Sequence, residues 1–328
     1  MELHAHRAKP GGGVIRGLRS AAGNVDAAVV LVFGSINVDV VVHTPRLPAP
    51  GETLIGSTVD RLPGGKGANQ AVALARLGAI VSIVGAVGDD PDGALSVAAL
   101  QGVDVTAVRT VDRPTGLALI TVDRAGENTI VVVPGANELA VAPAPGGPAE
   151  ALVVQLELPL AVVAAAVAGA CGLVVLNAAP AQPLPAALLA QVDVLVVNES
   201  EALVLSGAAS VQDALATLLH QVRRGVVVTL GAAGCLVGCG SGEAGAVVRV
   251  AGHTVPAVDT VGAGDAFVAA LTWALLQGCD LPDAAVFGCA AGAFTVTGVG
   301  ARSSPSADEL QQFLARQPAV RRSQSALA

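Results

Sequence analysis

The chain has 328 residues, enough for one large α/β domain or for two ordinary ones. It is 53% hydrophobic and only 13% charged, so it can bury a large apolar core. A formal net charge of −8 and an aromatic content of 2% argue against a nucleic-acid-binding surface, which needs positive charge and stacking rings.

The two ends of the chain differ from the rest. Residues 1–27 are basic, contain the run Gly11-Gly12-Gly13 and show no periodic pattern. They lack the apolar segment of a signal peptide, so we expect a disordered extension, with an organelle transit peptide as the alternative. Residues 318–328 are predicted to be a loose tail, which leaves residues 28–317 as the folded domain.

Between these ends, short runs of Val, Leu and Ile alternate with helical segments. Strands are predicted at residues 27–33, 80–87, 151–156, 173–176, 192–197 and 226–230, and helices at residues 67–77, 91–100 and 266–277. Continuous apolar strands separated by helices indicate an α/β fold, with a mainly parallel sheet covered by helices on both faces.

Two uncharged stretches, residues 158–181 and 284–301, are long enough to be mistaken for membrane spans. The first is broken by prolines and glycines, and the second is rich in small residues and ends in glycines. We expect both to be core elements, and we expect no membrane partner.

Two extended segments interrupt the alternation of strands and helices. Residues 38–56 are extended and rich in proline, and residues 117–133 read as a hairpin that turns at residues 123–126. Extended pieces inserted near the start of an α/β chain suggest a small β lid. We place it over the carboxyl edge of the sheet, where ligands bind in open α/β folds.

The five cysteines are an odd set, and only Cys235 and Cys239 stand close together in the sequence. A zinc site would want two such pairs. Buried free thiols in a reducing cytoplasm are the better interpretation, and we therefore expect a cytoplasmic protein.

The most informative stretch is residues 257–267, which joins an extended run to a long apolar segment with helical spacing. Gly262 and Gly264 allow a sharp turn and a close approach of a ligand to the backbone. A helix starting here would direct unpaired N–H groups and its positive dipole end at an anion. Asp265 stands at the same place, so one turn offers an anion site and a carboxylate base. The alternative is a glycine-rich turn with Asp265 as the N-cap.

Three further motifs stand at predicted strand ends. Asn37 and Asp39 offer donors and acceptors suited to vicinal hydroxyls, with an Asx-capped turn as the alternative. Glu157 ends a buried strand, where a carboxylate needs solvent, a partner or a ligand hydroxyl. Asn198 and Glu201 lie three residues apart at a helix start, where they could meet metal-bound water or phosphate, or simply form a capping motif.

Two glycine-rich pieces complete the set. Residues 64–70 open a helix and include Lys66 and Asn69, and residues 229–234 form a turn at a strand end. Each piece alone is weak, because glycine-rich turns are common without any ligand. Five such motifs at strand carboxyl ends in one chain are hard to attribute to turn chemistry, and together they predict a ligand site.

Taken in order, these motifs resemble the ribokinase family of sugar kinases (PfkB-type carbohydrate kinases), from about residue 29 to about residue 317. The most specific pieces are residues 64–70 and 258–267. Residues 34–37, 65–70 and 156–157 are most similar to those of the family members that act on ribose. The resemblance implies a Rossmann-like domain with a β lid that pairs subunits into a homodimer. It also implies ATP-dependent phosphorylation of D-ribose at its 5-hydroxyl, with Asp265 as general base and the turn from Gly262 to Gly264 as anion hole.

The resemblance assigns residues to both substrates, position by position. The sugar would be held by Asn37, Val38, Asp39, Gly65, Lys66, Gly67, Ala68, Asn69, Glu157 and Asp265. ATP would be held by Asn198, Thr229, Leu230, Gly231, Ala232, Ala233, Gly234, Gly264, Asp265 and Cys289. Cys289 and the pair Ala232-Ala233 depart from the residues common in relatives, and residues 142–150 are short where relatives often have a helix.

Ions are implied as well. Glu201 would tune the Mg²⁺ that accompanies ATP. Potassium would bind on two loops that should lie side by side, at Asp259, Val261, Thr295, Gly298, Gly300 and Ser304. The alternative activities are another sugar or nucleoside kinase of the same family and, from a different class, a sugar-responsive regulator without turnover.

Overall fold

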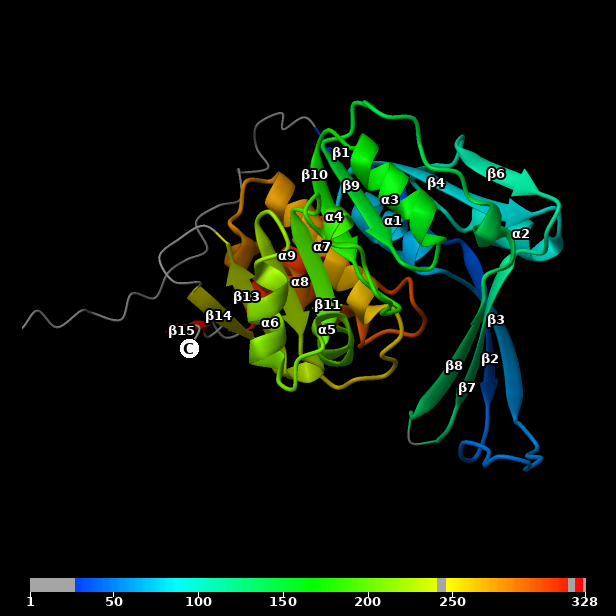
Figure 1. The fold of residues 1–328 in the computed structure, drawn as a ribbon. Coiled ribbons are helices and arrows are strands. Elements are labelled where there is room, and N and C mark those ends of the chain that lie inside the picture. The colour runs from blue at the N-terminus through cyan, green and yellow to red at the C-terminus, as the bar shows by residue number, and fades with distance from the viewer. Residues whose placement is uncertain (1–26, 125, 241–245, 318–321, 327–328) are drawn as a thin grey trace, which may run out of the picture.

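The computed structural model describes residues 27–124, 126–240, 246–317 and 322–326, and the predicted extension 1–27 lies almost entirely outside them. Within these ranges the strands form an 11-stranded sheet and a 4-stranded sheet. The large sheet and its helices make up the body, and the small sheet projects from one end of it (Figure 1). The predicted α/β class is confirmed.

The large sheet is mixed, with the strand order β15-β14-β13-β12-β11-β10-β9-β1-β4-β5 and with β6 paired to β4. Its strands are β1 (Val29–Phe33), β4 (Ile80–Gly88), β5 (Val103–Asp104), β6 (Val108–Val111), β9 (Ala151–Gln155), β10 (Leu173–Asn177), β11 (Val194–Asn198), β12 (Gly225–Thr229), β13 (Gly234–Cys239), β14 (Ala246–Ala251) and β15 (Arg322–Ala326). Neighbours from β5 to β12 are parallel, and those from β12 to β15 are antiparallel. The carboxyl ends of the parallel strands therefore meet at one edge.

Helices cover both faces of this sheet. They are α1 (Lys66–Arg76), α2 (Pro91–Ala98), α3 (Leu160–Gly169), α4 (Ala186–Leu189), α5 (Glu199–Ser206), α6 (Val211–Leu219), α7 (Ala263–Leu276), α8 (Leu281–Thr295) and α9 (Ala307–Arg316). Successive strand residues point to opposite faces. Val194 and Val196 belong to the core under α1, α7, α8 and α9, whereas Leu195 and Val197 belong to the core under α3 to α6. This is why the strands read as unbroken apolar runs.

The lid is the 4-stranded sheet, in the order β3-β2-β7-β8. It consists of β2 (Asn37–His43), β3 (Thr58–Gly64), β7 (Gly116–Val122) and β8 (Asn128–Val133). The predicted hairpin at residues 117–133 is confirmed, because β7 and β8 pair antiparallel. The extended segment predicted at residues 38–56 contains only β2. Strand β3 lies beyond it and carries no clear strand signal, because Asp60, Arg61 and Pro63 interrupt the pattern.

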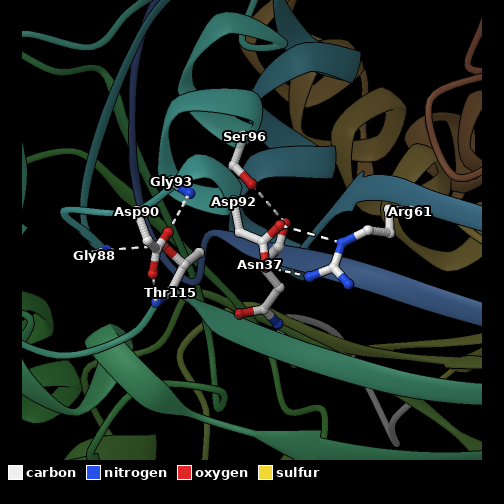
Figure 2. Close-up of polar contacts among 8 residues, drawn as sticks. All are labelled: Asn37, Arg61, Gly88, Asp90, Asp92, Gly93, Ser96 and Thr115. Carbon is white, nitrogen blue, oxygen red and sulfur yellow. Dashed lines mark hydrogen bonds and ion pairs between the residues drawn. The ribbon is translucent and has the colours of Figure 1, made fainter.

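Helix α2 is tied to the lid at its first turn (Figure 2). Asp90 is the N-cap, and its Oδ1 accepts from the Gly93 amide at 2.7 Å. The same carboxylate accepts from the amide and the hydroxyl of Thr115, at 2.8 and 2.7 Å. Thr115 directly precedes β7, so the start of α2 fixes the point where β7 leaves the body.

Two further contacts join α2 to the other lid strands (Figure 2). The Ser96 hydroxyl donates to the carbonyl of Asn37 at 3.0 Å, at the start of β2. Arg61 on β3 forms an ion pair with Asp92 at 2.5 Å. The base of the lid is therefore anchored on α2, and the rest of the lid extends away from the body.

One predicted terminal segment needs correction. The loose tail predicted at residues 318–328 is wrong for its central part, because Arg322–Ala326 forms β15 and pairs antiparallel with β14. The physical reason is the free edge of β14, which offers unpaired backbone groups to any nearby extended segment.

Residues 158–181 form α3 and β10, and most of residues 284–301 belong to α8, as expected for core elements. Among the described helices none is by itself long and apolar enough to cross a membrane, and α5 with α6 reaches that length only jointly, across a bend of 59°.

Candidate active site

A cavity of about 230 Å³ lies at the carboxyl edge of the large sheet. Residues from the ends of β10, β11 and β12 line it together with the starts of α1, α5 and α7. They are Lys66, Asn177, Ala179, Val196, Val197, Asn198, Glu201, Thr229, Thr260, Gly262, Gly264, Asp265 and Val268. The structure thus brings residues predicted for the sugar, for ATP and for the base into one cavity.

The start of α7 forms one wall of this cavity. Gly262 is the N-cap of α7, with φ of 80°. A Cβ at Gly262 would stand 2.3 Å from the Ala301 carbonyl oxygen, so both the conformation and the space require glycine. The helix begins at Ala263 and not at residue 266, so Asp265 lies in its first turn, and the alternative of Asp265 as N-cap is wrong. First-turn N–H groups and the positive dipole end favour an anion here.

Asp265 is buried, with 7% of its surface exposed. Its Oδ2 accepts from the Asn69 side-chain amide at 3.0 Å, and its Oδ1 accepts from the Gln70 side-chain amide at 2.9 Å. Burial raises the pKa of Asp265, while the positive charge of Lys66 and these two amide donors act against the rise. A carboxylate in this setting is suited to accept a proton from a bound group.

Lys66 is the first residue of α1 and lies among acidic side chains. Gly65 before it has φ of 88°, and a Cβ there would stand 2.8 Å from the amide nitrogen of Asn37. Burial alone would lower the pKa of Lys66, but nearby carboxylates outweigh it and raise this pKa. These carboxylates are Asp265, Glu157, Glu201 and Asp39. Lys66 is therefore held charged where negative charge is concentrated.

The remaining polar side chains predicted for the sugar lie at the base of the lid. Asn37 is 1% exposed, and its Oδ1 accepts from the Asn137 side-chain amide at 2.7 Å. Glu157 accepts from the amide of Lys66 at 3.2 Å and from the hydroxyl of Ser35. These bonds fix Asn37 and Glu157 close to the start of α1.

Asp39 is also buried, at 8% exposure, and packs so closely on Gly64 that a Cβ there would stand 2.1 Å from its Oδ1. Burial raises the pKa of Asp39 to about 7, and Glu157 and Asp265 add to this effect. Arg302 and Lys66 act in the opposite direction. Asp39 therefore titrates near neutral pH.

Arg302 lies near Asp39, a position that its sequence context does not indicate. Its Nη1 donates to the carbonyl of Ala99 at 2.5 Å, just beyond the end of α2. Its Nε and Nη2 are buried and have no hydrogen-bond partner among the described residues. Burial lowers the pKa of Arg302 to about 10, with Asp39 opposing the decrease. Arg302 thus brings a positive charge to Asp39 from a loop predicted only for potassium.

Asn198, predicted for ATP, and Glu201, predicted to tune Mg²⁺, form another wall of the cavity. Asn198 caps α5 by accepting from the Glu201 amide at 2.8 Å, and Glu201 accepts from the Asn198 amide at 2.8 Å. The capping alternative is confirmed. Both residues also line the cavity, so capping does not exclude contact with a ligand.

Other predicted ATP residues lie away from the cavity lining. Thr229 lines it, but the five residues after it do not: Leu230, the 3₁₀ segment Gly231–Ala233, and Gly234 at the start of β13. The Cys289 sulfur faces that of Cys235 at 3.7 Å, between α8 and β13. Their contacts with a nucleotide stay predictions.

The two loops predicted for potassium do lie side by side. Asp259 accepts from the amide of Val261 at 3.0 Å and, across the gap, from the amide of Gly300 at 2.9 Å. Ser304 is 2% exposed, and its hydroxyl has no partner among the described residues. One loop thus offers the carboxylate of Asp259, and the other, rich in small residues, offers the unsatisfied hydroxyl of Ser304.

Several buried polar residues of the site were missed from the sequence. Ser35, Asn137, Gln70, Gln155 and Asn177 are all buried and hydrogen-bonded to site residues or to each other. Ser35 and Gln70 stand inside the motifs at residues 34–37 and 64–70 but were given no role there. For Gln155 and Asn177 the signal was their position at the ends of apolar strands, where a polar residue needs a partner.

The model of the pfkB family carbohydrate kinases matches residues 27–308. The chain belongs to this family. Its relatives among the carbohydrate kinases include a ribokinase of Haemophilus influenzae, 41% identical over 301 residues that cover 86% of this chain and 97% of that protein. A deoxyribokinase of Salmonella typhi is 33% identical over 304 residues, covering 87% of this chain and 98% of that protein.

A solved family structure agrees with this assignment. The ribokinase of Arabidopsis thaliana, solved with ribose and ATP, superposes with a TM-score of 0.78 at 30% identity, covering 88% of this chain and 99% of that one. The fold seen here is therefore shared, over 88% of the chain, with a ribokinase solved with ribose and ATP.

Proposed function

We propose that the protein catalyses ATP-dependent phosphorylation of D-ribose at the 5-hydroxyl. One observation supports this most directly: a buried carboxylate, Asp265, lies in the first turn of α7, in the same cavity as Lys66. This cavity therefore offers a base, a cation and a helix N-terminus to one reacting group. The similarity to ribokinases over almost the whole chain supports ribose as the acceptor.

In this mechanism Asp265 accepts the proton of the sugar's primary hydroxyl as that oxygen attacks the γ-phosphorus, and the bond from the γ-phosphorus to the bridging oxygen breaks, so that ADP leaves. The first-turn N–H groups of α7 stabilise the negative charge that gathers on the transferred phosphoryl group. Lys66 adds a positive charge in the same cavity. Positioning and charge stabilisation are the main requirements of phosphoryl transfer, so no covalent step on the protein is needed.

The sugar would lie between the base of the lid and the start of α1. Asp39 and Asn37 would bind two adjacent hydroxyls, and Lys66, Asn69 and Glu157 would orient the ring. The lid is joined to the body through α2, so a sugar held on β2 would also set the position of the lid. Closure of the lid over the bound sugar would exclude water, which would otherwise hydrolyse ATP.

ATP would enter from the side of Asn198, Thr229 and Gly264. No cluster of three or more metal-ligating side chains occurs within the described part of the chain. Mg²⁺ would thus be held largely by phosphate oxygens and water, as is usual for this ion, with Glu201 oriented toward it through water. When bound, Mg²⁺ neutralises phosphate charge during the transfer.

Potassium would bind between the loops of Asp259 and Ser304. The residues fit, because a carboxylate, an unpartnered buried hydroxyl and backbone carbonyls form a hard-oxygen set of low charge. We expect KCl to raise kcat more than it changes sugar affinity. Initial rates at constant ionic strength, with a tetramethylammonium salt as the inert control, measure this, and a flat response would contradict it.

A homodimer through the lid is part of the proposal. Ile130 and Val131 on β8 and Val59 on β3 are 51%, 61% and 62% exposed, on a sheet that projects from the body. A second copy would cover such an apolar surface. Light scattering would give the oligomeric state.

The proposed location is the cytoplasm. The cysteines of the described residues are all free, which fits that location.

A panel of sugars with ATP tests the activity. Ribose, 2-deoxyribose, fructose and a nucleoside are compared by ADP release, and the product is identified by ³¹P NMR. We expect ribose 5-phosphate, with ribose preferred. Preference for 2-deoxyribose would favour the deoxyribokinase activity named for one relative, and binding without turnover would favour a sugar-responsive regulator.

A further inference from the structure

Three buried amide side chains behind Asp265 have no role in the mechanism above. Gln70 lies on α1 and is 0% exposed, Gln155 ends β9 and is 0% exposed, and Asn177 ends β10 and is 8% exposed. Gln155 and Asn177 are register partners on neighbouring strands, and Asn177 is in turn paired with Val196 of β11. The three amides thus form a row along the carboxyl edge of the sheet.

The hydrogen bonds in this row have one consistent direction. The Asn177 Nδ2 donates to the carbonyl of Val196 at 3.3 Å, so its Oδ1 is left to accept, and it does so from Gln70 Nε2 at 3.1 Å. Gln155 Nε2 donates to Gln70 Oε1 at 2.6 Å. The backbone carbonyl of Val196 thus sets the orientation of the Gln70 amide through Asn177. Gln155 adds a donor to Gln70 Oε1, and its own Oε1 has no partner among the described residues.

This orientation leaves Gln70 able only to donate toward Asp265. Its Nε2 donates to Asp265 Oδ1 at 2.9 Å, while Asn69 donates to Oδ2. A reversed Gln70 amide would place its oxygen against the carboxylate and against Asn177 Oδ1, and would lose three hydrogen bonds. Each hydrogen bond lost from a buried polar network costs stability, and here the reversal would also set two oxygens against each other.

Gln155 is placed by a close approach of the backbone. A Cβ on Gly34 would stand 2.0 Å from Gln155 Oε1, so the glycine after β1 is what makes room for this amide. No hydrogen bond joins Gln155 to Asp265 among those of the described residues, and its path to the base runs through Gln70.

We propose that Gln70 and Gln155 are positioning residues for the base: Gln70 fixes the direction of the Asp265 carboxylate and favours its ionised form, and Gln155 supports Gln70 in the donating orientation. The inference rests on the proposed function only in naming Asp265 as the base. The charged groups that face Asp265 are Lys66, Glu157 and Asp39. Lys66 favours the ionised carboxylate, the two acids oppose it, and the amide of Gln70 supports Lys66.

The test uses Gln70→Met, Gln155→Met and the double variant, because Met keeps the length of Gln and removes its donors. We expect Gln70→Met to lower kcat about 10- to 100-fold, the usual worth of a hydrogen bond to a charged group. Gln155→Met should lower kcat by a smaller factor. In both, KM for sugar and for ATP should stay within about twofold, and the acidic limb of the kcat profile should move to higher pH, because losing a donor disfavours the ionised carboxylate.

The double variant separates positioning from general packing. If Gln155 acts only through Gln70, the double variant should lose no more kcat than Gln70→Met alone, whereas independent effects would multiply. Gln191→Met is the matched control, because its amide donates to the Ala187 carbonyl at 2.9 Å outside this row. Multiplying effects, or an unmoved pH profile in a folded Gln70→Met protein, would overturn the proposal.

A readout without turnover separates this proposal from the proposed function. ¹³C NMR of labelled carboxyl groups, with Asp265→Asn used to assign the signal, follows the titration of Asp265 directly. A higher titration midpoint in Gln70→Met supports the positioning role even if ribose is not the substrate. If Gln70→Met fails to fold, Gln155→Met is measured in the same way, and an unchanged midpoint there would contradict its role.

Discussion

The side of the site proposed for the sugar and the side proposed for the nucleotide are built from different parts of the chain. On the sugar side, Lys66 and Asp265 line the cavity, whereas Asp39 and Glu157 stand outside its lining, at the base of the lid. Two of these acids, Asp39 and Asp265, are buried with raised pKa values. The nucleotide side consists mainly of helix starts and turns, where Gly262 and Gly264 bring backbone N–H groups to the cavity. Side chains with fixed partners can distinguish one sugar from another, whereas backbone groups bind phosphate without regard to the rest of the ligand.

The largest expected effect comes from the base, at the junction of the two sides. Asp265→Asn should lower kcat about 10²- to 10⁴-fold, the usual contribution of a general base, while sugar binding persists. Stopped assays for turnover and calorimetry for sugar affinity measure the two separately. Asp308→Asn, the same change at an exposed position on α9, is the control. Near-normal turnover in a folded Asp265→Asn protein would exclude Asp265 as the base.

A change confined to the sugar side should leave the nucleotide side untouched. Asp39→Ala should weaken ribose affinity about 10- to 100-fold, because it removes charged acceptors from two hydroxyls. ATP affinity measured without sugar should stay the same. Calorimetry measures the affinity of the variant for ribose and for ATP. An equal loss of affinity for both ligands would show that Asp39 supports the whole cavity.

Much of this arrangement was predictable, because its signals are local in sequence. Apolar runs predicted the strands of the body, and glycines and polar residues at their ends predicted Asp265, Lys66 and Asn198 at one edge. The orientation of Gln70 was not predictable, since its partners Gln155, Asn177 and Asp265 lie 85, 107 and 195 residues away. Arg302 escaped notice for the same reason, and β3 was missed because its charged residues and proline mask an edge strand.

Two glycines on the nucleotide side allow fold and function to be separated. A Cβ on Gly264 would meet no atom within 4 Å, so Gly264→Ala should fold normally and lower kcat about tenfold by keeping phosphate away from the helix start. Gly262→Ala should instead lose stability by at least about 1 kcal/mol, because φ is positive and Ala301 blocks the space. The unfolding temperature and kcat are measured for both variants. Equal stability losses would contradict this division of roles.

The smallest expected effect is a pH dependence on the sugar side alone. Burial, Glu157 and Asp265 raise the pKa of Asp39 to about 7, so below this pH the carboxyl is increasingly protonated in the free enzyme. Sugar hydroxyls bind the ionised form better, and we therefore expect KM for ribose to fall a few-fold as pH rises through about 7. The KM for ATP should not follow this curve.

The stability of the fold should change with pH in the opposite direction to ribose affinity. A carboxyl whose pKa is raised in the folded state stabilises the fold fully below its ordinary value of 3.8, and this contribution is lost as pH rises through about 7. The site thus holds Asp39 at a cost in stability that the sugar offsets when it binds. Urea unfolding across this pH range should show the cost, and Asp39→Asn should remove it.

Arg302 supplies the last and finest test, because it opposes the rise in the pKa of Asp39 from outside the sugar side. Arg302→Gln removes a positive charge, so the pKa of Asp39 should rise further and the fall in KM should move to higher pH. At pH 7 the KM for ribose should increase a few-fold with kcat little changed. In the Asp39→Asn background, the Arg302→Gln change should no longer alter KM. Because the guanidinium also donates to the Ala99 carbonyl at 2.5 Å, the unfolding temperature is measured in parallel. A KM change that persists in the Asp39→Asn background would show that Arg302 acts through α2 and not through the charge of Asp39.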